Sequence, residues 1–213
     1  EVDVVVVSED AMVAHGVALD AVRRRVDDGE YFCFIDPDIK ANGSFLAPLF
    51  EVLGDSHVAV TSGKEVWTDD NVVRSGDIGV GGRHFFDERG FVFGSPHLAV
   101  YRRRELEDTT RRWRIGLGSA GPDLSEAARS RLEQMGHRYV VYGTGKIVNC
   151  FLQADGMRVA HRDLPQLVHI GGLSHFLAPP GRERDTPDGE PQWAKWESTR
   201  ERYIVARHTA ETF

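Results

Sequence analysis

The stretch YFCFIDPDI at positions 31–39 decides the fold class, because an apolar run stops abruptly at two aspartates. Five strand-forming residues in succession, Tyr31–Ile35, indicate a strand buried on both faces, as in a sheet covered by helices. Asp36 and Asp38 follow at its carboxyl end, and Pro37 restricts the backbone between them. The stretch therefore predicts a sheet edge at which two carboxylates lie close together.

The neighbouring segments extend this strand into an alternation of strands and helices. Val2–Val7 predicts an earlier buried strand, and residues 15–27 place apolar side chains at helical spacing. Farther on, we expect an amphipathic helix at 45–53, closed by Gly54, and a strand at 57–61. A β-α-β-α-β alternation predicts an α/β fold with right-handed crossovers.

The second half of the chain has weaker patterns. Residues 62–97 are rich in glycine and charge and predict loops and hairpins. We expect a helix at 124–135 and strand character at 97–102, 138–142, 147–161 and 166–170. The predicted organisation is a core over 1–177, followed at 178–213 by a Pro/Gly-rich loop and a helical tail.

Length and charge exclude several classes of protein. The chain has 213 residues and a formal net charge of −7, which argues against a main role in gripping nucleic acid or an anionic membrane. Two cysteines do not form a disulfide framework, and no apolar stretch reaches the roughly 20 residues of a membrane span. Without a secretory signal at the start, we expect a cytoplasmic protein with no membrane span.

The D-x-D pattern at 36–38 carries chemistry because of where it lies. Ligands of open α/β sheets bind beyond the carboxyl ends of strands. Two oxygen donors this close suit Mg²⁺ or Mn²⁺ held together with substrate phosphates. The alternative is structural: Asp36 ends the strand and Asp38 caps the next turn.

Several segments together resemble GT-A glycosyltransferases, in particular the inverting enzymes similar to family 2. The pattern HG-x-AL-D at 15–20 followed by YFCFIDPDI resembles the helix, strand and metal-binding D-x-D of that family. The segments SPHLAVYRRREL at 96–107, GPDLSEAARSRLEQMGHRYVVY at 121–142 and LVHIGGLSHF at 167–176 match in the same order. The resemblance covers about residues 5–177 and implies a mixed, mostly parallel, Rossmann-like sheet flanked by helices.

The resemblance implies a metal and nucleotide site. Asp38 and Asp36 would bind the Mn²⁺ or Mg²⁺ of a nucleoside-diphosphate sugar, with Asp36 also near the ribose. His169 would complete the metal site from the H-x-G-G-x-S signature. The alternative for His169 alone is a hydrogen-bonded core residue.

The same resemblance places four further residues at the nucleotide. His15 and Gly16 would open a helix near the nucleotide, where a helix N-terminus favours anions. Gly171 and Gly172 would let the backbone approach the diphosphate closely.

The general base is expected at the start of the helix predicted at 124–135. Asp123 would take the proton from the acceptor hydroxyl, as an inverting transfer requires. Glu126 is the second candidate, and the two residues could instead form a helix-capping pair. The adjacent acidic pair usual in the family is absent here.

The expected function is therefore transfer of a sugar from a UDP-, dTDP- or GDP-sugar to a glycan, lipid or small-molecule acceptor, with inversion. A homodimer is compatible with this expectation. One alternative is a haloacid dehalogenase-like phosphohydrolase, although Lys40 occupies a position where those enzymes place Thr or Val. Another is a non-catalytic nucleotide-sugar-binding pseudo-transferase. The reason for that alternative is that the family's opening strands hold the nucleotide base, whereas this sequence has only Val2–Val7 before residue 15.

Overall fold

A computed structural model describes residues 13–26, 29–54, 56–63, 71–82, 84–118, 121 and 123–169. The strand predicted at Val2–Val7 lies outside these residues. The expected boundary at 177 and the tail at 178–213 lie outside them too.

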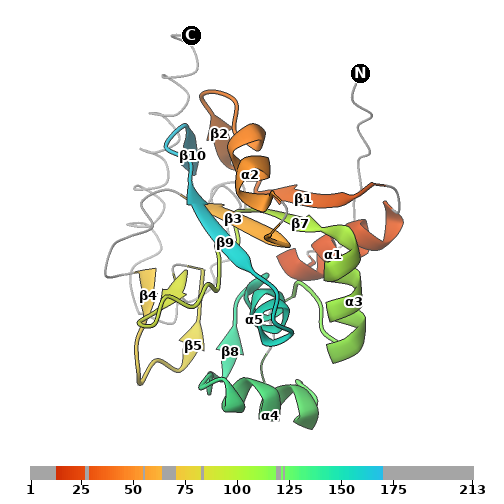
Figure 1. Ribbon diagram of the computed structural model, residues 1–213, viewed down its shortest axis with the longest axis vertical. Helices are drawn as coiled ribbons and strands as arrows, with labels where there is room; N and C mark the ends of the chain where they lie inside the picture. Colours follow the sequence, from red (N-terminus) through yellow and green to blue (C-terminus); the bar gives the residue numbers. More distant parts are fainter. Residues whose placement is uncertain are drawn as a thin grey trace, which may run out of the picture.

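The described chain alternates short helices and strands (Figure 1). The helices are α1 His15–Arg25, α2 Leu46–Leu53, α3 Arg103–Trp113, α4 Glu126–Gln134 and α5 Lys146–Ala154. The longer strands are β1 Tyr31–Ile35, β3 Ala59–Gly63, β7 Leu98–Arg102 and β9 Val159–Asp163. The shorter strands are β2 Ile39–Ala41, β4 Val72–Val73, β5 Gly79–Val80, β6 Phe86–Asp87, β8 Val141–Tyr142 and β10 Leu167–His169.

The main sheet has four strands in the order β1-β7-β3-β9. β7 pairs antiparallel with both β1 and β3, whereas β3 and β9 are parallel. Three strands thus run in one direction, but β7 separates β1 from β3 and two of the three pairings are antiparallel, so the sheet is mixed but not mostly parallel as expected. β1 and β3, the strands predicted at 31–35 and 57–61, therefore run in the same direction but are not neighbours.

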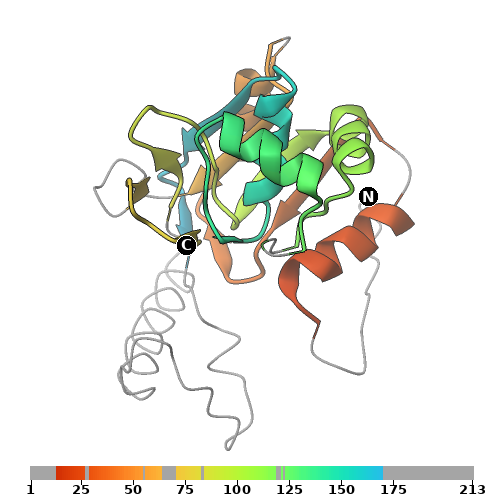
Figure 2. The ribbon, with the colours of Figure 1, turned by 90° about the horizontal axis from the view of Figure 1, so that it is seen from below.

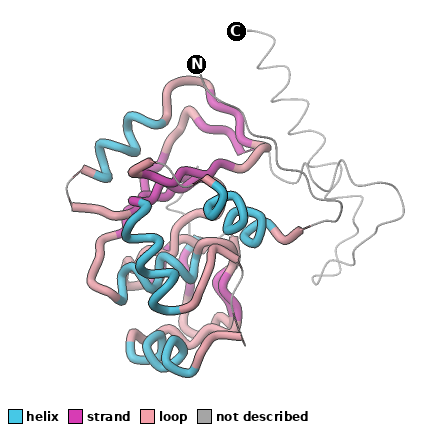
Figure 3. Tube along the Cα trace, turned by 90° about the vertical axis from the view of Figure 1, so that its right-hand side faces the viewer, coloured by secondary structure: helices cyan, strands magenta, loops and turns pink. Residues whose placement is uncertain are grey.

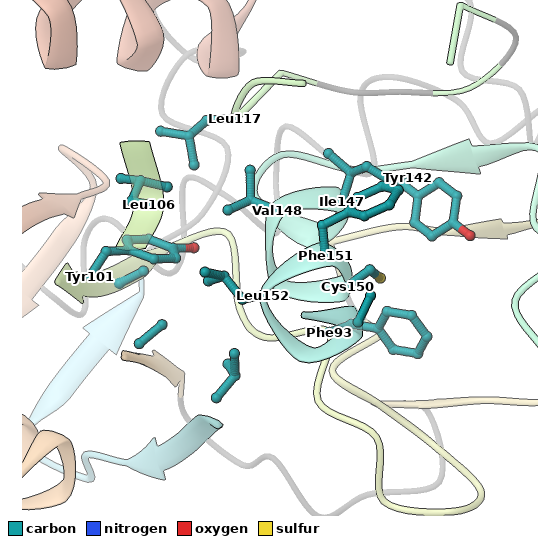
Figure 4. Packing of buried hydrophobic residues seen from close by; sticks show 14 of the residues in the cluster. Phe93, Tyr101, Leu106, Leu117, Tyr142, Ile147, Val148, Cys150, Phe151 and Leu152 are labelled. Atoms are coloured by element: carbon teal, nitrogen blue, oxygen red, sulfur yellow. The ribbon is translucent and has the colours of Figure 1, made fainter. Parts of the chain in front are cut away.

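Alternate residues of β7 face two different cores, as the two-residue period of a strand requires. Ala99 and Tyr101 join the larger cluster, which includes side chains of α3 and α5 (Figure 4). Leu98 and Val100 join the smaller cluster with Leu49 of α2. Helices therefore cover both faces of the centre of the sheet.

The prediction that Tyr31–Ile35 is buried on both faces was wrong. β1 lies at an edge of the sheet and buries only Phe32 and Phe34, while Cys33 and Ile35 are exposed. The central strand β7 is the one buried on both faces. A continuous apolar run does not distinguish an edge strand from a central one.

Most of the other predicted elements are confirmed, with one clear exception. The segment 147–161 was expected to be a strand, but its first part is helix α5. α5 lies between the sheet, α3 and α4 and buries every residue from Lys146 to Leu152 (Figure 2). Lys146, Asn149 and Gln153 recur in this segment at helical spacing, a period that the strand prediction overlooked.

A tight contact anchors helix α1, which carries His15. Gly16 lies against Gly118, and a Cβ at Gly16 would be only 2.3 Å from the Gly118 Cα. One turn along, the buried Asp20 accepts a hydrogen bond of 2.8 Å from the Leu117 N–H. These contacts hold the N-terminus of α1 in a fixed place.

None of the helices within the described residues is both long and apolar enough to cross a membrane.

Candidate metal centre

Strand pairing brings the end of β1 beside the start of β7. Ile35 is opposite Leu98 in the antiparallel register, so the next residue out on each side is Asp36 and His97. The Asp36 N–H donates to the His97 carbonyl at 2.8 Å. The backbone thus fixes the two side chains at one edge of the sheet.

A second pairing brings His169 to the same edge. β10 pairs antiparallel with β2, and His169 is opposite Ile39. Because Asp36 and Asp38 lie in the turn between β1 and β2, this register places His169 above both carboxylates.

The four side chains are in direct contact. His97 Nδ1 lies 3.0 Å from Asp36 Oδ2, and His169 Nε2 lies 3.2 Å from Asp38 Oδ1. His169 Nε2 is also 3.9 Å from Asp36 Oδ2. One ligand atom from each of Asp36, His97 and His169 lies within 4.8 Å of the other two. This spacing is close enough for one cation to bind all three.

Helix α1 adds a third imidazole at its first residue. His15 Nε2 lies 3.2 Å from Asp36 Oδ1, the oxygen that His97 does not contact. That oxygen is buried and has no hydrogen bond of regular geometry, although His15 is within ion-pairing distance. Asp36 is therefore the centre of the cluster.

The electrostatics favour a neutral imidazole at His169. Partial burial lowers the pKa of His169, and the neighbouring His97 lowers it further, against the opposing effect of Asp38 and Asp36. The rings of His97 and His169 have centroids only 3.8 Å apart, so two positive charges there would repel each other. A neutral imidazole is the form that binds a metal.

The donor set fits a divalent transition cation. Asp36, Asp38, His97 and His169 offer two carboxylates and two imidazoles. Imidazole nitrogen suits Mn²⁺ and later transition metals, whereas Mg²⁺ prefers oxygen ligands and retains bound water. Of the two cations expected from the sequence, Mn²⁺ fits this cluster better.

The structure thus brings together four residues singled out in the sequence, namely His15, Asp36, Asp38 and His169. Gly16 lies next to His15, but its contact with Gly118 accounts for a glycine without any ligand.

The remaining candidates are not at this cluster. Asp123 and Glu126 are exposed at the start of α4, where Ser125 caps the helix by accepting from the Ala128 N–H. α4 lies at the opposite end of the molecule from β2 and β10 (Figures 1 and 3). Gly171 and Gly172 lie outside the described residues.

His97 is the functional candidate that the sequence analysis missed. Its signal is its position as the first residue of the strand predicted at 97–102, as Asp36 directly follows the strand at 31–35. That signal becomes informative only when the two strands are known to be antiparallel neighbours. No family model, curated protein or solved structure matches the chain.

Proposed function

We propose that the chain is a metal-dependent glycosyltransferase that moves a sugar from a nucleoside-diphosphate donor to an acceptor hydroxyl. The observation that supports it best is the contact of His169 with Asp36 and Asp38, from distant parts of the sequence. The resemblance to GT-A enzymes implies this set of residues from motifs alone. The contact of His169 with the two carboxylates is what that resemblance implies for a metal site.

In this proposal Asp36, His97 and His169 hold a divalent cation, and Asp38, whose Oδ1 lies 3.2 Å from His169 Nε2, offers a second carboxylate. The bound cation would neutralise negative charge on the leaving diphosphate. His15 begins α1, whose N-terminus has no side-chain cap. Uncapped N–H groups at a helix N-terminus favour an anionic group such as a phosphate.

The proposed centre does not include a general base. Asp123 lies just before α4 and Glu126 is its first residue, and α4 is at the opposite end of the described residues from β2 and β10 (Figure 1). Inversion of configuration and the choice of base therefore rest on the resemblance alone.

A binding experiment tests the proposal. Thermal unfolding is measured with UDP, dTDP or GDP, each with and without Mn²⁺, on the full chain and on Asp36→Asn. We expect at least one nucleotide to raise the Tm only when Mn²⁺ is present, and the variant to lose this effect. Asp108→Asn is the matched control, because Asp108 is an exposed helix residue paired with Arg111.

Three outcomes would contradict parts of the proposal. A shift with Mn²⁺ alone and with no nucleotide would leave a metal centre without transferase function. Nucleotide binding without hydrolysis or transfer of any nucleotide sugar would favour the non-catalytic pseudo-transferase. Activity on an aryl phosphate would favour the phosphohydrolase. The structure argues against that last reading because imidazoles of His15 and His97 engage both oxygens of Asp36, its required nucleophile.

A further inference from the structure

A second candidate site lies far from the metal cluster. A cavity of about 270 Å³ opens between α4 and the segment that leads from α4 into β8. Its walls include Leu124, Leu132, His137, Arg138, Tyr139 and Tyr142. α4 and β8 lie at the opposite end of the molecule from β10 (Figure 1). This site therefore shares no residue with the proposed metal centre.

Two buried polar side chains in its wall have no hydrogen-bond partner. His137 is 1% exposed, and both of its ring nitrogens are unpartnered. Tyr142 is fully buried, and its hydroxyl makes no regular hydrogen bond although the Tyr139 backbone is near. Figure 4 shows the Tyr142 hydroxyl directed away from α5, at the edge of the buried cluster. Leaving such groups unpaired is unfavourable, so a ligand that reaches them with a hydrogen-bonding group would be stabilised there.

The interior of the cavity is aromatic and uncharged. The His137 ring lies 4.4 Å from the Phe91 ring and 5.9 Å from the Tyr139 ring, measured between centroids. Burial lowers the pKa of His137, and Arg89 lowers it further, so the ring is neutral near pH 7. Such a wall accepts an aromatic ring that carries an uncharged polar group.

The rim is positively charged. Arg129, Arg138 and Glu133 line the opening and are exposed, which gives one net positive charge. Arg129 donates to the Leu124 carbonyl at 2.8 Å, which fixes its position. Within the described residues Arg138 has no ion-pair partner, so its guanidinium is available to bind a carboxylate.

We propose that this cavity binds a small aromatic carboxylate with an uncharged polar group at the far end of its ring. The ring occupies the space beside His137 and Tyr139, the polar group pairs with His137 or Tyr142, and the carboxylate meets Arg138. The volume lies just below the ordinary range of small-molecule sites, roughly 300–1,000 Å³, which limits the ligand to a single ring.

The probe is 4-hydroxybenzoate, compared with benzoate and with phenol on the full chain. Binding is measured by NMR, following the signals of labelled histidine and tyrosine. We expect 4-hydroxybenzoate to shift the signals of His137, Tyr139 and Tyr142, and to bind about tenfold more tightly than either benzoate or phenol, because each lacks one polar contact.

Arg138→Ala should weaken 4-hydroxybenzoate binding about tenfold, and Arg24→Ala should leave it unchanged. Arg24 is an equally exposed arginine, on α1. The double variant His137→Phe and Tyr142→Phe should bind benzoate still but lose the preference for the hydroxyl.

Three results would overturn the proposal. One is the absence of NMR shifts at His137 and Tyr142 with 10 mM 4-hydroxybenzoate. A ligand with a Kd of about 0.1 mM would saturate the site at that concentration. The others are equal affinity of Arg138→Ala and the unmodified chain, and binding of phenol as tight as that of 4-hydroxybenzoate. Because Arg138 is exposed, its variant tests the proposal even if the double variant does not fold.

Discussion

The imidazole of His97 lies 3.0 Å from the carboxylate of Asp36, and the two residues are 61 positions apart in the chain. Antiparallel pairing of β1 with β7 creates this contact. His169 arrives independently through the pairing of β2 with β10. Two separate strand pairings therefore bring histidines to a single carboxylate, which is the arrangement expected of a binding centre.

The contact of His97 with Asp36 predicts a role for His97 in metal affinity. His97→Ala should weaken Mn²⁺ binding at least tenfold, or about 1.4 kcal/mol, because one of the three closest ligands is removed. Isothermal titration with Mn²⁺ measures the change. His57→Ala is the control, since His57 lies between α2 and β3, where its imidazole hydrogen-bonds to the neighbouring Ser56 hydroxyl. Equal affinity of His97→Ala and the unmodified chain would exclude His97 as a ligand.

Asp20 should contribute strongly to stability. It accepts from the Leu117 N–H and pairs with the buried Arg23, which also contacts Glu107. Asp20→Ala should lower the free energy of unfolding by about 2–4 kcal/mol, because it leaves a buried N–H unpaired and a buried cation with one partner fewer.

Urea unfolding measures the effect of Asp20→Ala against Asp108→Ala. Asp108 pairs with Arg111 on the surface of α3, and an exposed pair contributes only about 0–1 kcal/mol. Similar losses in the two variants would show that the Asp20 contacts do not stabilise the fold.

Substitutions at Gly94 and Gly90 distinguish the cost of backbone strain from the cost of a steric clash. Both have positive φ, at 83° and 80°, but a Cβ at Gly90 would meet nothing within 4 Å. A Cβ at Gly94 would lie 2.6 Å from both Asn149 Nδ2 and Thr61 Cγ2. Gly90→Ala should cost about 1 kcal/mol, and Gly94→Ala about 1–3 kcal/mol more. Thermal unfolding of the two variants decides, and equal losses would rule out the predicted clash.

The stability of the protein should depend on pH through His161. Burial and, to a smaller extent, the neighbouring Lys146 together lower the pKa of His161 from 6.5 to about 3. Between these values the unfolded chain binds a proton that the folded chain does not. Stability therefore rises with pH across this window and falls as the solution is acidified from pH 6.5.

A comparison with His161→Gln isolates this contribution. Glutamine can still hydrogen-bond to Thr61, the partner of His161 Nδ1 at 2.7 Å, but it does not titrate. The unmodified chain should lose up to roughly 1.4 kcal/mol more per pH unit than the variant across the window. Parallel curves of unfolding free energy against pH would show that His161 takes up its proton as readily in the folded state.

Local patterns were sufficient for the elements with a clear period or end signal. The helix at 45–53 was predicted from its apolar spacing and from Gly54, and α2 ends there with Gly54 at a positive φ. The strand expected at 147–161 was wrong for helix α5, whose helical period is marked by the polar residues Lys146, Asn149 and Gln153. The candidate metal ligands Asp36, Asp38 and His169 were predicted because their motifs carry them, whereas His97 belongs to no such motif.

The sequence by itself determined that a strand ends at Asp36 and Asp38, because the apolar run and the proline act over a few neighbouring residues. It also marked His169 as a candidate ligand. Only the tertiary structure decided which side chains meet Asp36. No local pattern in the sequence specifies that β7 pairs with both β1 and β3. The same holds for the cavity beside α4, since Leu124 and Tyr142 become its walls only when α4 packs on the segment before β8.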